Sequence, residues 1–275
     1  MNGATAMSRR SVAGRATAAL LMCFAAAIAA PPAAAAEVAA NAPVKLKIAF
    51  AGDSLVDNYW SGVSRIVGAS ACLRNAIELG RYAKNGTGLT RGDRLYWPRE
   101  IRRIGEVFKP TVIVVSLGVN DRQFIVDGAG RHTAWGSPDW PARYRGEVDD
   151  FLEGAAATGA TVLWVGLPVM REPVDNADAR GKNELYAAEI AKLGDRNIEY
   201  VGPWTLNAQG GDAFASFGPD RSGRMVQIRT SDGQHFTTAG EDLAAAHIYP
   251  KIVAALSRIG VRFEQCPNLE ARKEN

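Results

Sequence analysis

The stretch Thr111-Val112-Ile113-Val114-Val115-Ser116-Leu117 decides the fold class of this 275-residue chain. Its unbroken run of mostly β-branched residues is typical of a strand buried on both faces, as in a parallel sheet. Shorter strand-like stretches lie at 46–51, 77–84, 161–166 and 198–201, and stretches with helical spacing lie at 97–108, 140–157, 183–193 and 238–259. This alternation predicts an α/β fold with a doubly wound, mostly parallel five-stranded sheet flanked by helices.

The chain is organised as one domain. It has no repeat in the range typical of solenoids, and no linker that would divide it. We expect a lead-in at 37–45, the domain at 46–262 and a C-terminal tail at 263–275. The stretches 121–139 and 203–231 are rich in Gly, Pro and Asp and lack clear periodicity. They are predicted to be long loops, which in compact domains are often functional.

The net charge of the chain comes from its N-terminus. The chain has 32 Lys+Arg and 29 Asp+Glu, and residues 1–36 hold three arginines (Arg9, Arg10 and Arg15) and no acid. The rest therefore has 29 side chains of each sign. A nucleic-acid-binding domain needs a basic surface, so this balance gives no support for a nucleic-acid partner. The chain is 22% charged and 47% hydrophobic, as in ordinary globular proteins.

Residues 1–36 have the pattern of a secretory signal peptide. Three arginines precede an apolar stretch at 16–30, and small residues follow up to Ala36. The apolar stretch is shorter than the ~20 residues that a membrane-spanning helix needs. We therefore expect cleavage after Ala36, no membrane span in the mature chain, and a periplasmic or secreted location. An uncleaved anchor is the alternative, and the export route stays open.

Two cysteines, Cys72 and Cys266, remain after removal of the signal segment. In an oxidising compartment they invite one disulfide. Two unpaired thiols are the alternative, because the sequence does not show whether their Cα atoms come within bonding reach.

Four polar clusters follow predicted strands or precede the last predicted helix. In an open α/β sheet, ligands bind outside the carboxyl ends of the strands, so these clusters are placed to meet there. They are Gly52-Asp53-Ser54-Leu55, Asn85-Gly86-Thr87-Gly88, Gly118-Val119-Asn120-Asp121 and Asp232-Gly233-Gln234-His235. Each one alone is more typical of a helix cap or a turn.

Together, the clusters contain the groups needed for acyl transfer. A serine at a strand-to-helix turn can expose its hydroxyl as a nucleophile, and an asparagine amide can donate to an oxyanion. Asp232 lies three residues before His235, where it can bond Nδ1 and leave Nε2 free as a base. Of the two other histidines, His247 is expected to pack in the last helix and His132 to lie on the surface.

The order of these clusters resembles the SGNH/GDSL hydrolase family. Gly-Asp-Ser-Leu stands near the start, Gly-x-Asn-Asp in the middle and Asp-x-x-His near the end, over about residues 46–258. The surroundings, including Trp164-Val165-Gly166-Leu167-Pro168, are similar to a secreted bacterial subgroup of uncharacterised function. The resemblance implies a flavodoxin-like three-layer sandwich.

The resemblance also implies roles for individual residues. Ser54 would be the nucleophile, His235 the base and Asp232 the group that orients it. The oxyanion hole would consist of the backbone N–H groups of Ser54 and Gly88 and the side-chain amide of Asn120, with Gly86 as the alternative to Gly88. No cofactor is expected, and no metal, because the sequence lacks a paired-His or Cys-rich cluster.

The expected function is that of an extracytoplasmic serine esterase. Its substrates would be short-acyl esters, such as O-acetyl groups on a cell-envelope or extracellular glycan, because no long apolar lid segment of a lipase is present. An O-acyltransferase with the same triad and a non-catalytic glycan-binding or envelope protein are the alternatives. Residues that would contact substrate are Arg91, Asp93, Arg122 and Trp135, with Arg171 as a further candidate; solvated surface positions are the other interpretation of these charges. The sequence does not predict the oligomeric state.

Overall fold

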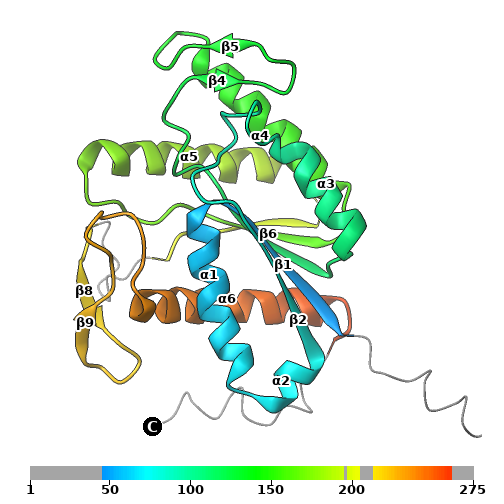
Figure 1. The fold of residues 1–275 in the computed structure, drawn as a ribbon, viewed down its shortest axis with the longest axis vertical. Helices are drawn as coiled ribbons and strands as arrows, with labels where there is room; N and C mark the ends of the chain where they lie inside the picture. The colour runs from blue at the N-terminus through cyan, green and yellow to red at the C-terminus, as the bar shows by residue number, and fades with distance from the viewer. Residues whose placement is uncertain (1–44, 195–196, 205–212, 262–275) are drawn as a thin grey trace, which may run out of the picture. The chain divides into compact units, whose positions relative to one another are not determined.

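The computed structural model describes residues 45–194, 197–204 and 213–261. The elements in chain order are β1 (Leu46–Gly52), α1 (Ser54–Gly68), α2 (Ala71–Ala76), β2 (Ile77–Ala83), α3 (Trp97–Phe108), β3 (Val112–Ser116), β4 (Ile125–Val126), β5 (His132–Thr133), α4 (Trp140–Ala156), β6 (Thr161–Val165), α5 (Pro173–Lys192), β7 (Ile198–Val201), β8 (Phe217–Pro219), β9 (Met225–Gln227) and α6 (Thr238–Arg258). Figure 1 shows their arrangement.

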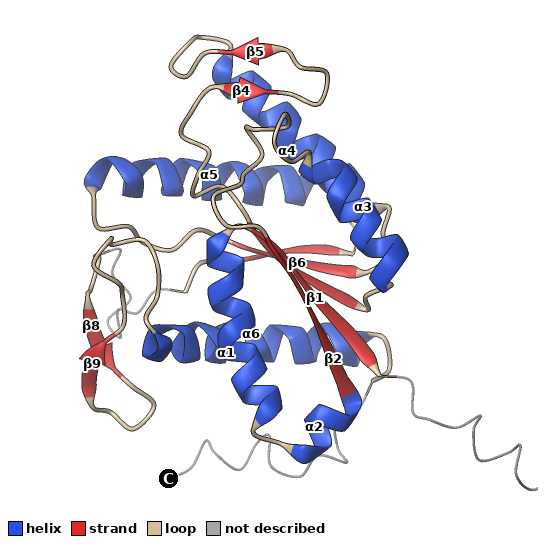
Figure 2. Ribbon diagram, viewed as in Figure 1, coloured by secondary structure: helices blue, strands red, loops and turns tan. Residues whose placement is uncertain are grey.

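Five of the strands form one sheet in the order β2-β1-β3-β6-β7. Every neighbouring pair in this sheet is parallel. Helices cover both faces, with α3, α4 and α5 on one side and α1 and α6 on the other (Figure 2). The predicted fold class is therefore confirmed, and the five predicted strands are the five strands of the sheet.

Side chains of the central strands alternate between two apolar cores, one on each face. In β3, Ile113 and Val115 belong to the core beneath α3, α4 and α5. Val112 and Val114, also fully buried, belong to the core beneath α1 and α6. The unbroken apolar run of this strand is thus explained by burial on both faces. Because all five strands run the same way, their carboxyl ends share one edge.

The sequence predictions miss the start of α5. The helix begins at Pro173 rather than at 183, with the proline in its first turn, where a missing N–H costs nothing. Its buried residues are few and include Lys182 and Glu189. The apolar spacing that marks an amphipathic helix is therefore weak in its first half.

Three small elements were also not predicted. Helix α2 leads from α1 into β2, and its cap is the side chain of Ser70. The stretches 121–139 and 203–231 are not wholly loops, since the first contains the β4–β5 hairpin and the second the β8–β9 hairpin. Hairpin strands of two or three residues leave no periodic signal.

Several predictions concern residues outside the described ranges. These are the signal segment 1–36, residues 37–44 of the lead-in and the tail 263–275. Cys72 is disulfide-bonded, whereas Cys266 lies outside the described ranges, so their pairing stays a prediction. Among helices built from described residues, none has the length and apolar character to cross a bilayer.

Candidate active site

Ser54 stands at the turn between β1 and α1, at the carboxyl edge of the sheet. The turn requires Gly52, because its φ is +151° and a Cβ there would overlap the carbonyl oxygen of Ser116 on β3. Asp53 caps the helix by accepting a hydrogen bond from the Leu55 N–H at 2.9 Å. Ser54 is therefore the first residue of α1, where helix N–H groups have no partner within the helix.

The buried carboxyl group of Asp53 ties this turn to the loop after β3. Its second oxygen accepts from the Gly118 N–H at 3.1 Å, and the backbone N–H of Asp53 donates to the Ser116 carbonyl at 3.1 Å. Burial raises the pKa of Asp53 to about 7, against the lowering effect of the N–H donors, and the charge of Asp121 adds to the rise. Asp53 therefore fixes the position of Ser54 and is closed off from solvent.

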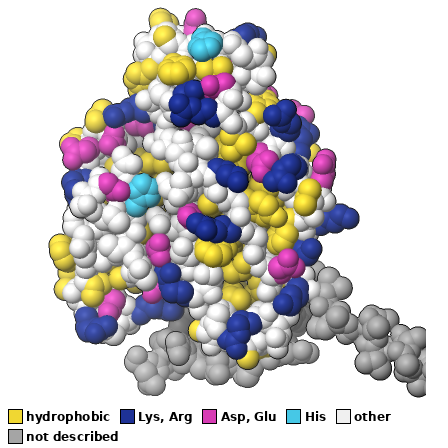
Figure 3. Space-filling model, in the orientation of Figure 1, with side chains coloured by type: hydrophobic (Ala, Val, Ile, Leu, Met, Phe, Trp, Pro, Cys, Tyr) yellow, Lys and Arg dark blue, Asp and Glu magenta, His cyan; other side chains and the backbone are white. Residues whose placement is uncertain are grey.

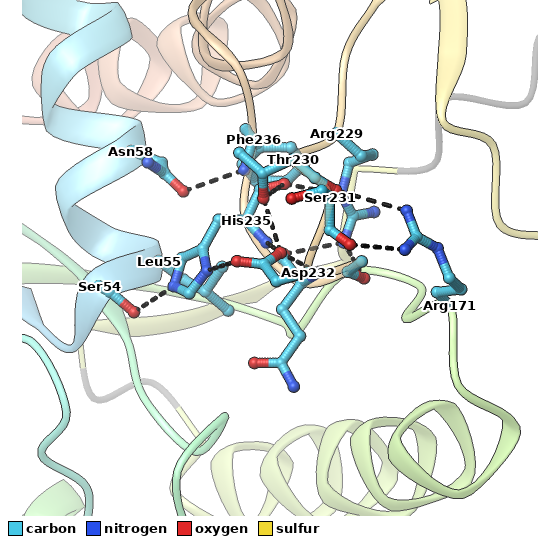
Figure 4. Close-up of polar contacts among 12 residues, drawn as sticks. Ser54, Leu55, Asn58, Arg171, Arg229, Thr230, Ser231, Asp232, His235 and Phe236 are labelled. Atoms are coloured by element: carbon cyan, nitrogen blue, oxygen red, sulfur yellow. Dashed lines mark hydrogen bonds and ion pairs between the residues drawn. The ribbon is translucent and has the colours of Figure 1, made fainter.

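Ser54, His235 and Asp232 form a continuous chain of short contacts (Figure 4). The Ser54 Oγ lies 2.6 Å from His235 Nε2. The His235 Nδ1 lies 2.7 Å from Asp232 Oδ2. The serine belongs to α1, and the other two residues belong to the loop before α6. Ser54 and His235 are 181 positions apart in the sequence. An ionised Asp232 accepts a hydrogen bond from the protonated Nδ1 of His235, which leaves Nε2 unprotonated and able to accept one from the serine hydroxyl.

Asp232 is held as an anion by donors around its carboxyl group. Oδ1 accepts from Thr230 Oγ1 at 2.6 Å, from the Gln234 N–H at 2.7 Å and from the His235 N–H at 3.0 Å. Partial burial acts to raise the pKa of Asp232, but these hydrogen bonds and the contact with the histidine ring outweigh it. The pKa of Asp232 lies well below its usual range, so the histidine faces a carboxylate.

Arg229 holds the loop that carries Asp232 and His235. It is 4% exposed, and its guanidinium donates to four carbonyl oxygens rather than to a carboxylate. The acceptors are those of Val169 at 2.7 Å, Gln234 at 2.8 Å, Gly233 at 3.2 Å and His235 at 3.3 Å. Burial lowers the pKa of Arg229 to about 10, so the group is still charged at neutral pH.

The rings of Phe214 and Phe236 lie within 5.0 Å of the Arg229 guanidinium carbon. The sequence interpretation missed Arg229, which falls in a stretch predicted to be a long loop. No spacing or motif in that stretch marks it.

The candidate oxyanion-hole residues lie on two neighbouring loops. The side-chain amide of Asn120 donates to the carbonyl oxygen of Thr87 at 2.8 Å, which joins the loop after β3 to the loop after β2. Within the described ranges, the backbone N–H of Gly88 has no hydrogen-bond partner. Gly86 has φ +74°, and an added Cβ there would have nothing within 4 Å, so a glycine is favoured at this position by the backbone conformation of the turn.

Asp121 explains why residue 88 is a glycine. A Cβ at Gly88 would overlap the Asp121 carboxylate. That carboxylate is fully buried and accepts from the N–H groups of Leu89 at 3.0 Å and Thr90 at 3.1 Å, and from the Tyr144 hydroxyl at 3.0 Å. The Gly-x-Asn-Asp motif thus supplies both a partly buried amide and a fully buried acid that holds the loop after β2 in place.

The residues predicted to contact substrate differ in their surroundings. Arg91 and Asp93 pair with each other at 2.6 Å. Trp135 is 45% exposed and packs edge-on against Trp140. Arg122 pairs with a carboxylate of α5 and lines a pocket beside the site. Of these predicted residues, only Arg122 lies in that pocket.

Arg171 is engaged within the protein. Its guanidinium donates to the carbonyl oxygens of Ser231 at 2.7 Å and Thr230 at 3.4 Å, as Figure 4 shows. The backbone N–H of Arg171 also donates to the Gly233 carbonyl at 3.2 Å. These donors support the loop before α6, and the contact of Arg171 with an anionic part of the substrate stays a prediction.

A pocket of about 190 Å³ adjoins the triad. Its lining includes Asn120 and Gln234, the neighbour of His235. Its other walls come from the loop after β3, from the segment after β6 and from the first turns of α5, which contribute Asp175 and Asp178. The sequence interpretation missed both aspartates because it began the helix ten residues too late.

The described residues carry no group of three His, Cys, Asp or Glu side chains arranged to hold a metal ion. On the face drawn in Figure 3, basic and acidic side chains are interspersed rather than gathered into a basic stripe.

Comparison with solved structures identifies the class of fold. The chain is similar to a carbohydrate esterase family 3 protein from Talaromyces cellulolyticus, with 16% identity and a TM-score of 0.51, over 78% of this chain and 99% of that one. It is similar to a GDSL-like lipase from Bacteroides thetaiotaomicron, with 19% identity and a TM-score of 0.51, over 81% and 96%. An acetyl esterase mutant with an acetate ion matches at 14% identity and a TM-score of 0.53, over 78% and 99%. The fold is that of the SGNH/GDSL hydrolases.

Within this fold class, the chain belongs to the family described as "Protein of unknown function (DUF459)", whose model matches residues 47–251. No curated protein matches the chain in sequence.

Proposed function

We propose that the protein is an extracytoplasmic serine esterase that hydrolyses short-acyl esters, such as O-acetyl groups on a cell-envelope or extracellular glycan. One observation carries the proposal: the Ser54 hydroxyl contacts His235 at 2.6 Å, and His235 contacts an ionised Asp232 at 2.7 Å. This is the relation of nucleophile, base and orienting acid that activates a serine hydroxyl.

The reaction proceeds through an acyl-enzyme. Ser54 Oγ attacks the ester carbonyl carbon while His235 Nε2 takes the hydroxyl proton. The tetrahedral intermediate then expels the alcohol, which takes that proton from His235. A water attacks the acyl-enzyme with His235 again as base, and the carboxylic acid and free Ser54 are released. Asp232 stabilises the imidazolium in both halves of the cycle.

The developing oxyanion is bound by three donors at one place. These are the backbone N–H groups of Ser54 and Gly88 and the side-chain amide of Asn120. Gly88 rather than Gly86 is assigned because Gly88 lies against the carboxylate of Asp121, the neighbour of Asn120, whereas an added Cβ at Gly86 has nothing within 4 Å. Loss of one such donor costs on the order of 3 kcal/mol in the transition state.

A short acyl group suits the surroundings of the site. The adjoining pocket is small, and two aspartates and an arginine line it. Each buried methylene contributes ~0.8 kcal/mol, whereas each polar group that loses water without a new partner costs roughly 1–3 kcal/mol. A long alkyl chain would therefore gain little by entering this pocket, so the pocket is not built to hold a long acyl chain. The names of the fold relatives, a carbohydrate esterase and an acetyl esterase, agree with this preference.

A panel of p-nitrophenyl esters and acetylated glycans tests the proposal. We expect turnover highest with acetyl and falling with chain length, and at least ~1000-fold lower for Ser54→Ala and His235→Ala at unchanged circular dichroism. Undiminished turnover by a folded Ser54→Ala protein would refute the assignment. A maximum at long acyl chains would refute the substrate class. Transfer of acetyl to a glycan acceptor, seen by mass spectrometry, would instead favour the acyltransferase.

A further inference from the structure

The pocket beside the triad lies between the loop after β3, the segment after β6 and the first turns of α5. It reaches Asn120 on one side and Gln234 on the other. If Ser54 and His235 act as proposed, one end of any ester bound at the site extends into this pocket. The residues that line the pocket therefore indicate whether the acyl part or the alcohol part of the ester enters it.

Asp175 connects the two sides of the pocket. Its Oδ1 accepts from Arg122 Nη2 at 2.9 Å, and its Oδ2 lies 3.5 Å from Gln234 Nε2. The carboxylate thus links the loop after β3 to the loop before α6. Its side chain is 22% exposed, so it is still within reach of a ligand.

Asp178 lies one turn further along α5, and a buried lysine holds its carboxylate in place. Its Oδ2 accepts from Lys182 Nζ at 2.7 Å. Lys182 is 4% exposed and also donates to the Gly118 carbonyl at 2.9 Å, which ties the pocket wall to the loop that carries Asn120. Asp178 is thereby fixed, with 19% of its side chain exposed.

The charges of the pocket wall balance, because Asp175 pairs with Arg122 and Asp178 pairs with Lys182, which lies behind the wall. Such a wall offers both donors and acceptors but no excess charge, and it suits a neutral group with many hydroxyls. An alkyl chain would displace water from these polar side chains without replacing the hydrogen bonds that the water makes. A charged ligand would leave one sign uncompensated.

We propose that this pocket binds the sugar ring that bears the ester, with ring hydroxyls bonded to Asp175, Asp178 and Arg122. The acyl group then points away from the pocket, and the protein selects its substrate by the alcohol. The position of the ester relies on the proposed function, whereas sugar binding itself needs no turnover.

Sugar binding to the Ser54→Ala protein tests the site without catalysis. Glucose, xylose and N-acetylglucosamine are titrated, with binding followed by protein NMR and calorimetry. We expect at least one to bind, and Asp175→Asn and Arg122→Gln, each added to Ser54→Ala, to weaken it at least 10-fold at unchanged melting temperature. Glu199→Gln is the matched control, because Glu199 also pairs with an arginine, Arg258, at 3.0 Å but lies outside the pocket. Absence of binding by all three sugars, or equal binding by all variants, overturns the inference.

The kinetic counterpart compares an O-acetylated form of the bound sugar with p-nitrophenyl acetate. We expect Asp175→Asn to lower the ratio of the two kcat/KM values at least 10-fold. Sugar binding without turnover of any ester would refute the proposed function and leave the sugar site standing. Turnover of both esters with an unchanged ratio, and no sugar binding, would refute the sugar site alone.

Discussion

The two halves of the candidate active site are held in place by different means. The serine half is built from backbone: the β1–α1 turn lies against β3, and Asp53 bonds only to main-chain N–H groups. The histidine half is a loop before α6 held by side chains, chiefly the buried guanidinium of Arg229. Asp53 is fully buried, whereas the side chain of Asp232 is 48% exposed.

This difference predicts how each half responds to substitution. Changes in the serine half disturb the register of parallel strands, so they should act mainly on the stability of the whole domain. Changes in the histidine half leave the sheet intact, so they should act mainly on the alignment of the base with the nucleophile. Two substitutions test this contrast, and a third outside both halves serves as a reference; they follow in order of decreasing expected effect.

Gly52→Ala should have the largest effect. The residue has φ +151°, and a Cβ would overlap the Ser116 carbonyl, so β1 and β3 must move apart. We expect a loss on the order of 3–5 kcal/mol in the free energy of unfolding, seen as a lower melting temperature or insoluble protein. Gly68→Ala is the control, because nothing lies within 4 Å of its added Cβ. Equal stability of the two variants would contradict the account of the serine half.

Arg229→Met should reduce activity more than stability. Without the guanidinium, four loop carbonyls lose a donor, and a displacement of His235 by about 1 Å costs roughly 100-fold in turnover. We expect kcat to fall about 100-fold with KM little changed, and added guanidinium to restore part of the loss.

Arg171→Met is the matched control for this substitution. Arg171 is more exposed and its guanidinium contacts only two carbonyls of the same loop, so we expect a loss of only a few-fold. Equal losses for the two variants, or failure of guanidinium to restore any turnover to Arg229→Met, would show that Arg229 has no positioning role.

Glu147→Gln should have the smallest effect and serves to separate scaffold from site. Burial, with the charges of Asp150 and Asp127, raises the pKa of Glu147 from 4.5 to about 7. The folded state therefore favours the protonated form, and this stabilisation is complete below pH 4.5 and is lost as the pH rises through 7. Gln cannot ionise, so we expect Glu147→Gln to be more stable than wild type at pH 8, by about 1–2 kcal/mol, and similar at pH 4.

Chemical denaturation at both pH values measures this difference. Ester turnover should not change, since Glu147 lies on α4 away from the triad. A wild-type stability that increases between pH 5 and pH 8 relative to the variant would contradict the assigned pKa direction.

The same contrast explains what could be predicted from the sequence. The serine half has a short local sequence pattern, a buried strand followed by Gly-Asp-Ser. The sequence therefore predicts correctly that Ser54 follows the end of a strand. The three central strands of the sheet, β1, β3 and β6, were likewise predicted because each is mostly an apolar run, whereas β2 and β7 mix apolar with charged residues. Arg229, Asp175 and Asp178 carry no such pattern: their roles come from contacts with residues far away in the chain, such as Val169 and Arg122.

Labelling with a serine-directed fluorophosphonate tests the central claim most directly, namely that Ser54 is a nucleophile activated by His235. We predict a single adduct on Ser54 by peptide mass spectrometry in the wild-type protein, none in Ser54→Ala, and labelling at least ~100-fold slower in a folded His235→Ala protein. An adduct at another serine, or equal labelling rates with and without the imidazole, would contradict the account.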